Sequence, residues 1–315
     1  MMKKLILLAP VLIVLIAWFI PATQEETITV NASFFNVYRV LSTPVKWKEW
    51  RRDLRKISPA DTSKIVIKKD SSFFNINYPD LELRVNIQDG VFTIDDNSNG
   101  KNTHYSFLAE PAKAPNTTLI MVDKKINFIR FLFQHLDAAS FNDTHINELK
   151  TYMETDSLKY GCNVFKTHVP EANLIVMSKV VLSKTKYADA LAILSQLQQF
   201  VQLHQLKQTQ PLIAQYLPKH NTDSTTVKIG FFIDKETVSE NGVTFTRMPK
   251  GGPLYAAKFS GRFDRRLKIY SSLQQYFTDH LYQQAILPFE SFLDNKLPTS
   301  DTSHVNVQVN FSTYF

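Results

Sequence analysis

The carboxylate of Glu290 stands out chemically because apolar residues surround it in the sequence. It lies within Ala285–Pro298, which reads AILPFESFLDNKLP. In a short strand Glu290 and Phe292 share one face, so both side chains point into a core or into a cavity. A buried charge is costly without a partner. One interpretation is that Glu290 binds a cationic or hydrogen-bond-donating ligand beside aromatic rings. The other is that it is an exposed strand residue, or that it pairs with a basic residue of the chain such as Arg262 or Lys258.

Other residues that could support catalysis or bind a metal are isolated in the sequence. His145 and Glu148 have helical i, i+3 spacing, but no third ligand and no HExxH pattern accompany them. Cys162 has no activating base nearby in the sequence. We therefore expect no metal, no cofactor and no assigned catalytic residue, and we lean against an enzyme. A hydrolase or cyclase reaction that uses Glu290 stays open as the alternative.

Composition excludes several classes of protein. The chain has 315 residues and 44% hydrophobic residues, enough for two domains with real cores. Its eight glycines form neither GxxxxGK[ST] nor a strand-linked GxGxxG, which argues against nucleotide chemistry. The single cysteine excludes an internal disulfide framework. The net charge of +7 comes from scattered basic residues without a DNA- or RNA-binding motif, so we expect no nucleic acid partner.

The first residues predict an uncleaved membrane anchor. Lys3 and Lys4 precede an uncharged apolar run at residues 5–20, LILLAPVLIVLIAWFI, and acidic residues follow it. The positive-inside tendency then places the rest of the chain on the extracytoplasmic side. We expect a single-pass protein with its anchor in residues 1–26; a cleaved export signal is the alternative.

The next stretch predicts an α+β domain. Ile28 and Val30 alternate with polar residues as in a half-buried strand, and a helical period follows from Phe34. Pro44 ends that helix, and a second short helix carries Trp47 and Trp50 on one face. Strand-like runs fill residues 64–128, and a long closing helix follows, capped by Asn142 or Asp143.

This order, opened by ITVNASFFNVYRVLSTPVKWKEW, resembles the START-like (SRPBCC) polyketide cyclase and lipid-transport superfamily over residues 27–158. The resemblance implies a helix-grip fold, in which a curved sheet wraps a C-terminal helix around a hydrophobic cavity for a lipid-like ligand. Trp47 and Trp50 then either close one end of the core or gate the ligand.

Residues 159–315 contain an internal repeat, with units at about 160–235 and 241–315. Leu197–Phe200 corresponds to Leu273–Tyr276, PLIAQY at 211–216 to PFESF at 288–292, and DSTTVKI at 223–229 to DTSHVNV at 301–307. Each unit predicts strand, helix, strand, strand. Paired through their strands, two units would cover one sheet face with helices and leave a groove on the other. Ala214 occupies in the first unit the position that Glu290 has in the second.

This duplicated unit, with MPKGGPLYAAKFSGRF, SSLQQYF and LPFESFLDN, resembles the GyrI-like effector-binding family. The resemblance implies a groove between the halves that binds small molecules and contains an acid, here Glu290. Phe292 and Phe263 stand where that family has tyrosines.

We therefore predict a membrane-anchored protein that binds a small hydrophobic or cationic molecule. A structural or interaction protein with filled grooves is a further alternative. The expected ligand-binding residues are Glu290, Phe292, Tyr255, Phe259, Phe263, Tyr270, Trp47 and Trp50.

Overall fold

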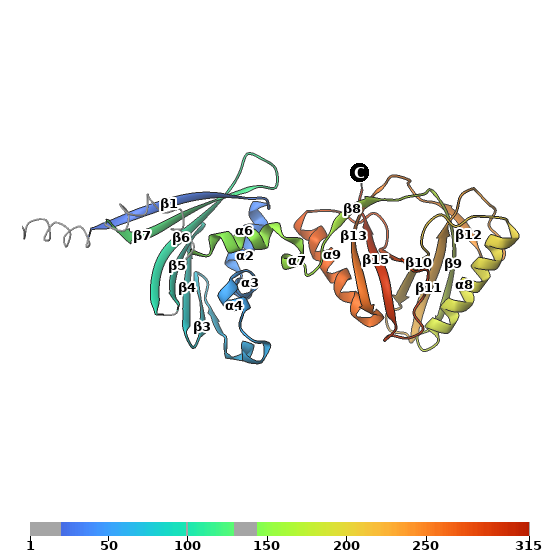
Figure 1. Cartoon of the computed structure of the whole chain (residues 1–315), viewed down its shortest axis with the longest axis horizontal. Coiled ribbons are helices and arrows are strands. Elements are labelled where there is room, and N and C mark those ends of the chain that lie inside the picture. The colour runs from blue at the N-terminus through green and yellow to red at the C-terminus, as the bar shows by residue number, and fades with distance from the viewer. Residues whose placement is uncertain (1–19, 99, 129–143, 315) are drawn as a thin grey trace, which may run out of the picture. The chain divides into compact units, whose positions relative to one another are not determined.

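The computed structural model describes residues 20–98, 100–128 and 144–314. The chain divides into two compact units, Met1–Lys159 and Tyr160–Phe315, and each contains a large antiparallel sheet (Figure 1). The predicted α+β class is confirmed. Within the described ranges no helix is long and apolar enough to cross a membrane. The predicted anchor at residues 5–20 lies outside those ranges except for Ile20.

The first unit has a seven-stranded sheet in the order β1-β7-β6-β5-β4-β3-β2. Its elements in chain order are β1 (Pro21–Val30), α2 (Phe34–Ser42), α3 (Pro44–Trp50), α4 (Arg52–Arg55), η1 (Pro59–Lys64), β2 (Val66–Lys69), β3 (Phe73–Tyr78), β4 (Leu81–Gln88), β5 (Val91–Ser98), β6 (Lys101–Pro111), β7 (Thr118–Asn127), α6 (Ile146–Glu154) and α7 (Asp156–Lys159). The helices α2, α3 and α6 bury their apolar side chains against one face of this sheet.

Two boundaries differ from the sequence prediction. β1 begins at Pro21, not after residue 26, because it pairs with β7 from Pro21 onward. The closing helix is not one long element, since α6 ends at Glu154 with Thr155 as its C-cap. Its buried face consists of Ile146, Leu149, Tyr152 and Met153. The predicted caps Asn142 and Asp143 lie outside the described residues.

The second unit has an eight-stranded sheet in the order β12-β9-β11-β10-β14-β15-β13-β8. Its elements are β8 (Phe165–His168), β9 (Asn173–Leu182), α8 (Lys186–Leu203), β10 (Ile213–Pro218), β11 (Ser224–Phe232), β12 (Thr244–Arg247), β13 (Pro253–Arg262), η3 (Phe263–Arg266), α9 (Leu267–Asp279), β14 (Phe289–Phe292) and β15 (His304–Ser312). Figure 1 shows α8 along β9 and β11, and α9 along β13 and β15.

The elements of this unit follow the order strand, helix, strand, strand twice, as β9-α8-β10-β11 and β13-α9-β14-β15. Two further strands were not predicted: β8 joins the edge of the second repeat, and β12 joins the edge of the first. The strand registers also correct one alignment, because they make Val227 the equivalent of Val307, where the sequence comparison matched Ile229.

α8 turns Ala190, Ile193, Leu197 and Phe200 toward the core, while Leu191 is exposed. α9 in the same way buries Ile269, Leu273 and Phe277, while Leu267 is exposed.

Candidate functional site

Glu290 lies at the centre of the second sheet. Its strand, β14, pairs with β10 so that Glu290 is directly opposite Ala214, and the two repeats meet there. Side chains alternate along β14, and Glu290 and Phe292 share the face that the helices cover. Glu290 is 1% exposed, so of the alternatives left open by the sequence the exposed acid is excluded.

The partner of this buried acid is Arg266, at the end of η3. Arg266 donates from Nε to Glu290 Oε1 at 2.5 Å, and Tyr270 donates its hydroxyl to the same oxygen at 2.9 Å. Arg266 also donates from Nη1 to the carbonyl oxygen of Phe263 at 2.9 Å and lies 3.4 Å from the centre of the Phe263 ring. The acid is thus paired within its own unit, and the base is neither Arg262 nor Lys258.

Two buried oxygen atoms beside this pair have no hydrogen-bond partner among the described residues: Oε2 of Glu290 and the hydroxyl of Tyr216. Burial raises the pKa of Glu290, and the charge and hydrogen bonds of Arg266 and Tyr270 oppose that rise only in part. Burial, together with the nearby charge of Glu290, also raises the pKa of Tyr216.

The other aromatic residues expected at this site also lie on the helix side of the sheet. Phe263 and Phe292 are buried in one core, with ring centres 6.5 Å apart. Tyr255 belongs to a second cluster, where its hydroxyl bonds that of Tyr282 at 2.9 Å, and Phe259 packs against both cores. These residues fill the space under the helices, and their ligand-binding role stays a prediction.

Trp47 and Trp50 belong to the core of the first unit, where they are 0% and 1% exposed. Their ring centres are 4.8 Å apart, and Trp47 donates from Nε1 to the carbonyl oxygen of Leu41 at 2.8 Å. This arrangement favours the interpretation in which they close the core.

A buried charge cluster in the first unit was missed in the sequence. Arg51 is fully buried and donates from Nη1 to Asp96 on β5 at 2.8 Å and from Nε to Asp53 at 3.0 Å. His145 Nε2 lies 3.2 Å from the same guanidinium, and Glu148 lies 3.2 Å from His145 Nδ1. Burial opposes ionisation of Asp53, but Arg51 outweighs it and lowers the pKa of Asp53. His145 and Glu148 therefore meet as part of an ion network that fastens α6 to the preceding helices.

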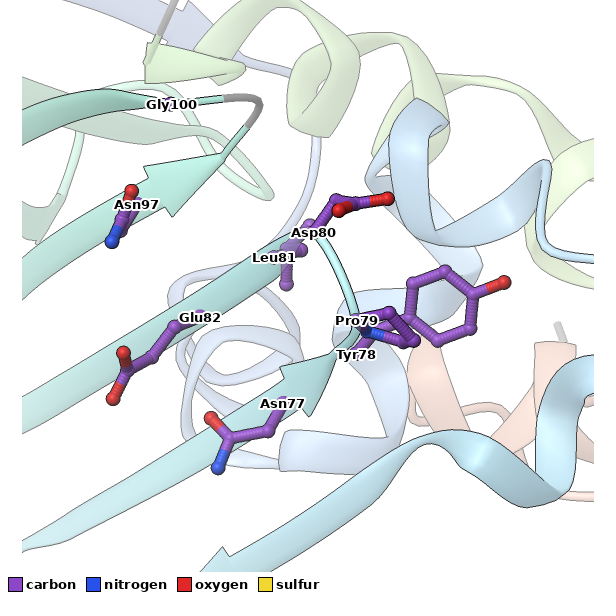
Figure 2. A pocket seen from close by; sticks show the side chains of 8 residues that line it. All are labelled: Asn77, Tyr78, Pro79, Asp80, Leu81, Glu82, Asn97 and Gly100. Atoms are coloured by element: carbon purple, nitrogen blue, oxygen red, sulfur yellow. The ribbon is translucent and has the colours of Figure 1, made fainter.

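A cavity of about 680 Å³ lies at the β3–β4 turn of this unit (Figure 2). Asn77, Glu82 and Asn97 pair across neighbouring strands there, on the sheet face opposite the buried core. Figure 2 shows Asp80 at the turn itself. Within the described ranges, no three acidic, histidine or cysteine side chains gather in a group that could hold a metal ion.

The open face of the second sheet contains two cavities, and Phe289 lines both. The larger has a volume of about 460 Å³ and a floor of buried apolar side chains, Leu174, Val176, Ile213 and Phe289. We call it the apolar cavity. Gly230 is part of this floor. A Cβ atom at this position would be 2.7 Å from the carbonyl oxygen of Ile175, which explains why the residue is a glycine. The groove predicted on this face is therefore present, but Glu290 does not line either cavity.

Lys228 on β11 and Arg247 on β12 are the charged side chains among the described residues that line the apolar cavity. Lys228 is partly buried, and no ion pair or hydrogen bond to its ammonium group is found among the described residues. Arg247 at the rim is exposed and paired with Glu236. Lys228 was missed because a lysine between Val227 and Ile229 is typical of the solvent face of a strand.

No family model matches the chain, and no curated protein matches it. Among solved structures, the EcmrR C-terminal domain is 17% identical, with 49% of this chain and 98% of that chain covered and a TM-score of 0.39. A START superfamily protein from Mycobacterium smegmatis is 13% identical, with 42% and 97% covered and a TM-score of 0.29. A hydrolase from Listeria innocua is 10% identical, with 48% and 92% covered and a TM-score of 0.34. Neither of the two families that the sequence resembles is shown for this chain.

Proposed function

We propose that the second unit binds a small amphipathic molecule in the apolar cavity, with the anionic group of that molecule at Lys228. The volume of about 460 Å³ falls within the roughly 300–1,000 Å³ of small-molecule sites. The floor is apolar and buried, and polar groups such as Gln215 and Lys228 lie at its sides. An apolar cavity with a few polar groups orients a ligand through those groups.

The single observation that carries this proposal is that the ammonium group of Lys228 has no partner among the residues that the structure describes. A partly buried charge interacts more strongly with an opposite charge than an exposed one does, because less water screens it. The expected cationic ligand depended on Glu290, which lies on the other face and is paired with Arg266. The charge in the groove therefore favours an anion.

Calorimetric titration with decanoate tests the proposal. The intact chain is expected to bind decanoate, and Lys228→Gln is expected to weaken the affinity about 10- to 150-fold, the effect of one hydrogen bond to a charged group. Glutamine is chosen because Gln308 is the equivalent residue in the second repeat.

Lys268→Gln on α9 is the matched control, since Lys268 is exposed on the helix side and its substitution removes the same charge. Equal affinities of the intact chain and Lys228→Gln for decanoate would contradict the proposal, as would an equal loss in Lys268→Gln.

We propose separately that residues 5–20 anchor the chain in a membrane with the two units on the extracytoplasmic side. The uncharged run LILLAPVLIVLIAWFI after two lysines supports this.

A further inference from the structure

The two cavities of the groove occupy equivalent positions in the two repeats. Thr246 on β12 pairs with Leu174 at the apolar cavity, and Thr167 on β8 pairs with Leu254 at the second cavity. The second cavity has a volume of about 220 Å³. Phe289 lines both, so the two cavities lie next to each other at this side chain.

Different residues occupy equivalent positions in the two cavities. The strand registers match Lys228 with Gln308 and Gly230 with Asn310. The same hydrogen bond occurs once in each repeat: Gln208 donates from Nε2 to the carbonyl oxygen of Gln210 at 2.7 Å, and Gln284 donates from Nε2 to the carbonyl oxygen of Ile286 at 2.8 Å. Gln210 and Ile286 are therefore equivalent positions. One cavity thus has a lysine, a glycine and an isoleucine where the other has three amides. We call the second one the amide cavity.

The wall of the amide cavity is a neutral hydrogen-bonding surface. Gln308 donates from Nε2 to Asn310 Oδ1 at 2.7 Å, and Asn310 donates from Nδ2 to Ser291 Oγ at 3.0 Å. The described residues that line this cavity include no Asp, Glu, Lys or Arg, and the histidine among them, His168, is exposed. Phe232, Leu254 and Phe289 supply apolar surface beside these amides.

Two polar side chains in this wall have no hydrogen-bond partner within the described part of the chain. Neither the hydroxyl of Thr167 nor the side-chain amide of Gln210 makes a hydrogen bond to another described residue, and both side chains are partly buried. A hydroxyl and an amide each donate and accept. They complement a ligand whose own groups both donate and accept, which is the property of sugar and polyol hydroxyls.

We infer that the amide cavity is a second subsite, which takes a neutral, hydroxyl-rich group of the same ligand that fills the apolar cavity. This inference rests on the proposed function, because the apolar cavity supplies the binding of the ligand body. The ligand class is then an amphiphile with an apolar body, an acidic group at Lys228 and a sugar-like or polyol group beyond Phe289.

The test uses octyl β-D-glucopyranoside and octanol, which share an alkyl chain and differ in the sugar. In calorimetric titrations of the intact chain, the glucoside is expected to bind more tightly by roughly 2- to 12-fold for each hydrogen bond to the sugar. Thr167→Val and Gln210→Leu, which keep the side-chain shape and remove no internal hydrogen bond, are expected to reduce that preference. Thr246→Val is the matched control in the apolar cavity and is expected to leave it unchanged.

The outcomes separate this inference from the proposed function. Equal affinities for glucoside and octanol, together with decanoate binding that depends on Lys228, would overturn the subsite and leave the proposed function standing. An equal reduction of the sugar preference by Thr246→Val and Thr167→Val would also overturn it, since the sugar would not then lie in the amide cavity. Absence of decanoate binding would contradict the proposed function itself.

Discussion

Replacing Arg266 with methionine is expected to destabilise the second unit strongly at neutral pH. Arg266 is 7% exposed and its acid partner is 1% exposed, so the substitution leaves Glu290 buried with Tyr270 as its remaining hydrogen-bond donor. Removing one partner of a buried ion pair costs about 3–5 kcal/mol. The contacts of the guanidinium with Phe263 are lost as well.

The loss of stability in Arg266→Met is expected to depend on pH. The pKa of Glu290 in the folded unit is raised above its ordinary value of 4.5, mainly by burial. A pKa that is raised in the folded unit contributes stability that is fully present below pH 4.5, the ordinary pKa of Glu290 in the unfolded chain. This stability is lost as the pH rises through the pKa of Glu290 in the folded unit. Because Arg266 opposes the rise, its removal raises the pKa of Glu290 further. The deficit of Arg266→Met should therefore be small near pH 4 and grow toward neutral pH.

Hydrogen exchange of the intact chain, followed by mass spectrometry, measures this effect separately in each unit. Peptides from β14 and β15 should lose protection in Arg266→Met, while peptides from β4 and β5 in the first unit should not. Arg265→Met is the control, since Arg265 is an exposed neighbour. A deficit below about 1 kcal/mol at neutral pH, or the same deficit at both pH values, would refute the reasoning about the buried pair.

Two further predictions concern the tyrosines beside Glu290 and the membrane segment. Tyr270→Phe should cost about 1.5–3 kcal/mol, because its hydroxyl donates to the acid, whereas Tyr216→Phe should be neutral or slightly stabilising, because its buried hydroxyl has no described partner. Hydrogen exchange would contradict this if Tyr216→Phe were the more damaging change. In cell fractionation the full chain should sediment with membranes and a chain without residues 2–20 should not; identical behaviour of the two would contradict the anchor.

The sequence predicted the parts of the fold that depend on local periodicity and on the repeat. Alternation along Ala285–Pro298 predicted that Glu290 and Phe292 share a face, and the matched blocks made Ala214 the equivalent of Glu290. The structure buries Glu290 and pairs it with Ala214 across β14 and β10. The partner of the acid could not be predicted in the same way, because η3 brings Arg266 back over the sheet. The bases on β13 are exposed, and they contact Asp264 (Arg262) and the Phe165 ring (Lys258) instead. The alternation of side chains along a strand predicts which face of the sheet Glu290 takes, but it does not predict which residue Glu290 pairs with.

Residues whose role depends on distant segments were harder to predict. Arg51 belongs to a basic run that is typical of a solvated surface, yet Asp96, from a strand far along the chain, makes its burial possible. Lys228 follows the pattern of an exposed strand residue, and only the sheet order shows that its face lines a cavity. The repeat did contain one indication of a special role for Lys228. When the strands are aligned correctly, Lys228 is equivalent to the uncharged Gln308, so the two repeats differ in charge at this position.

The charge preference of the groove is the most direct test of the proposed function. The measurement compares decanoate with decyltrimethylammonium, which share an apolar chain of similar length and differ in the sign of the head group, by calorimetric titration of the intact chain. The anion is expected to bind more tightly than the cation, and Lys228→Gln is expected to remove that preference. Tighter binding of the cation, with an affinity that Glu290→Gln reduces and Lys228→Gln does not, would contradict the account.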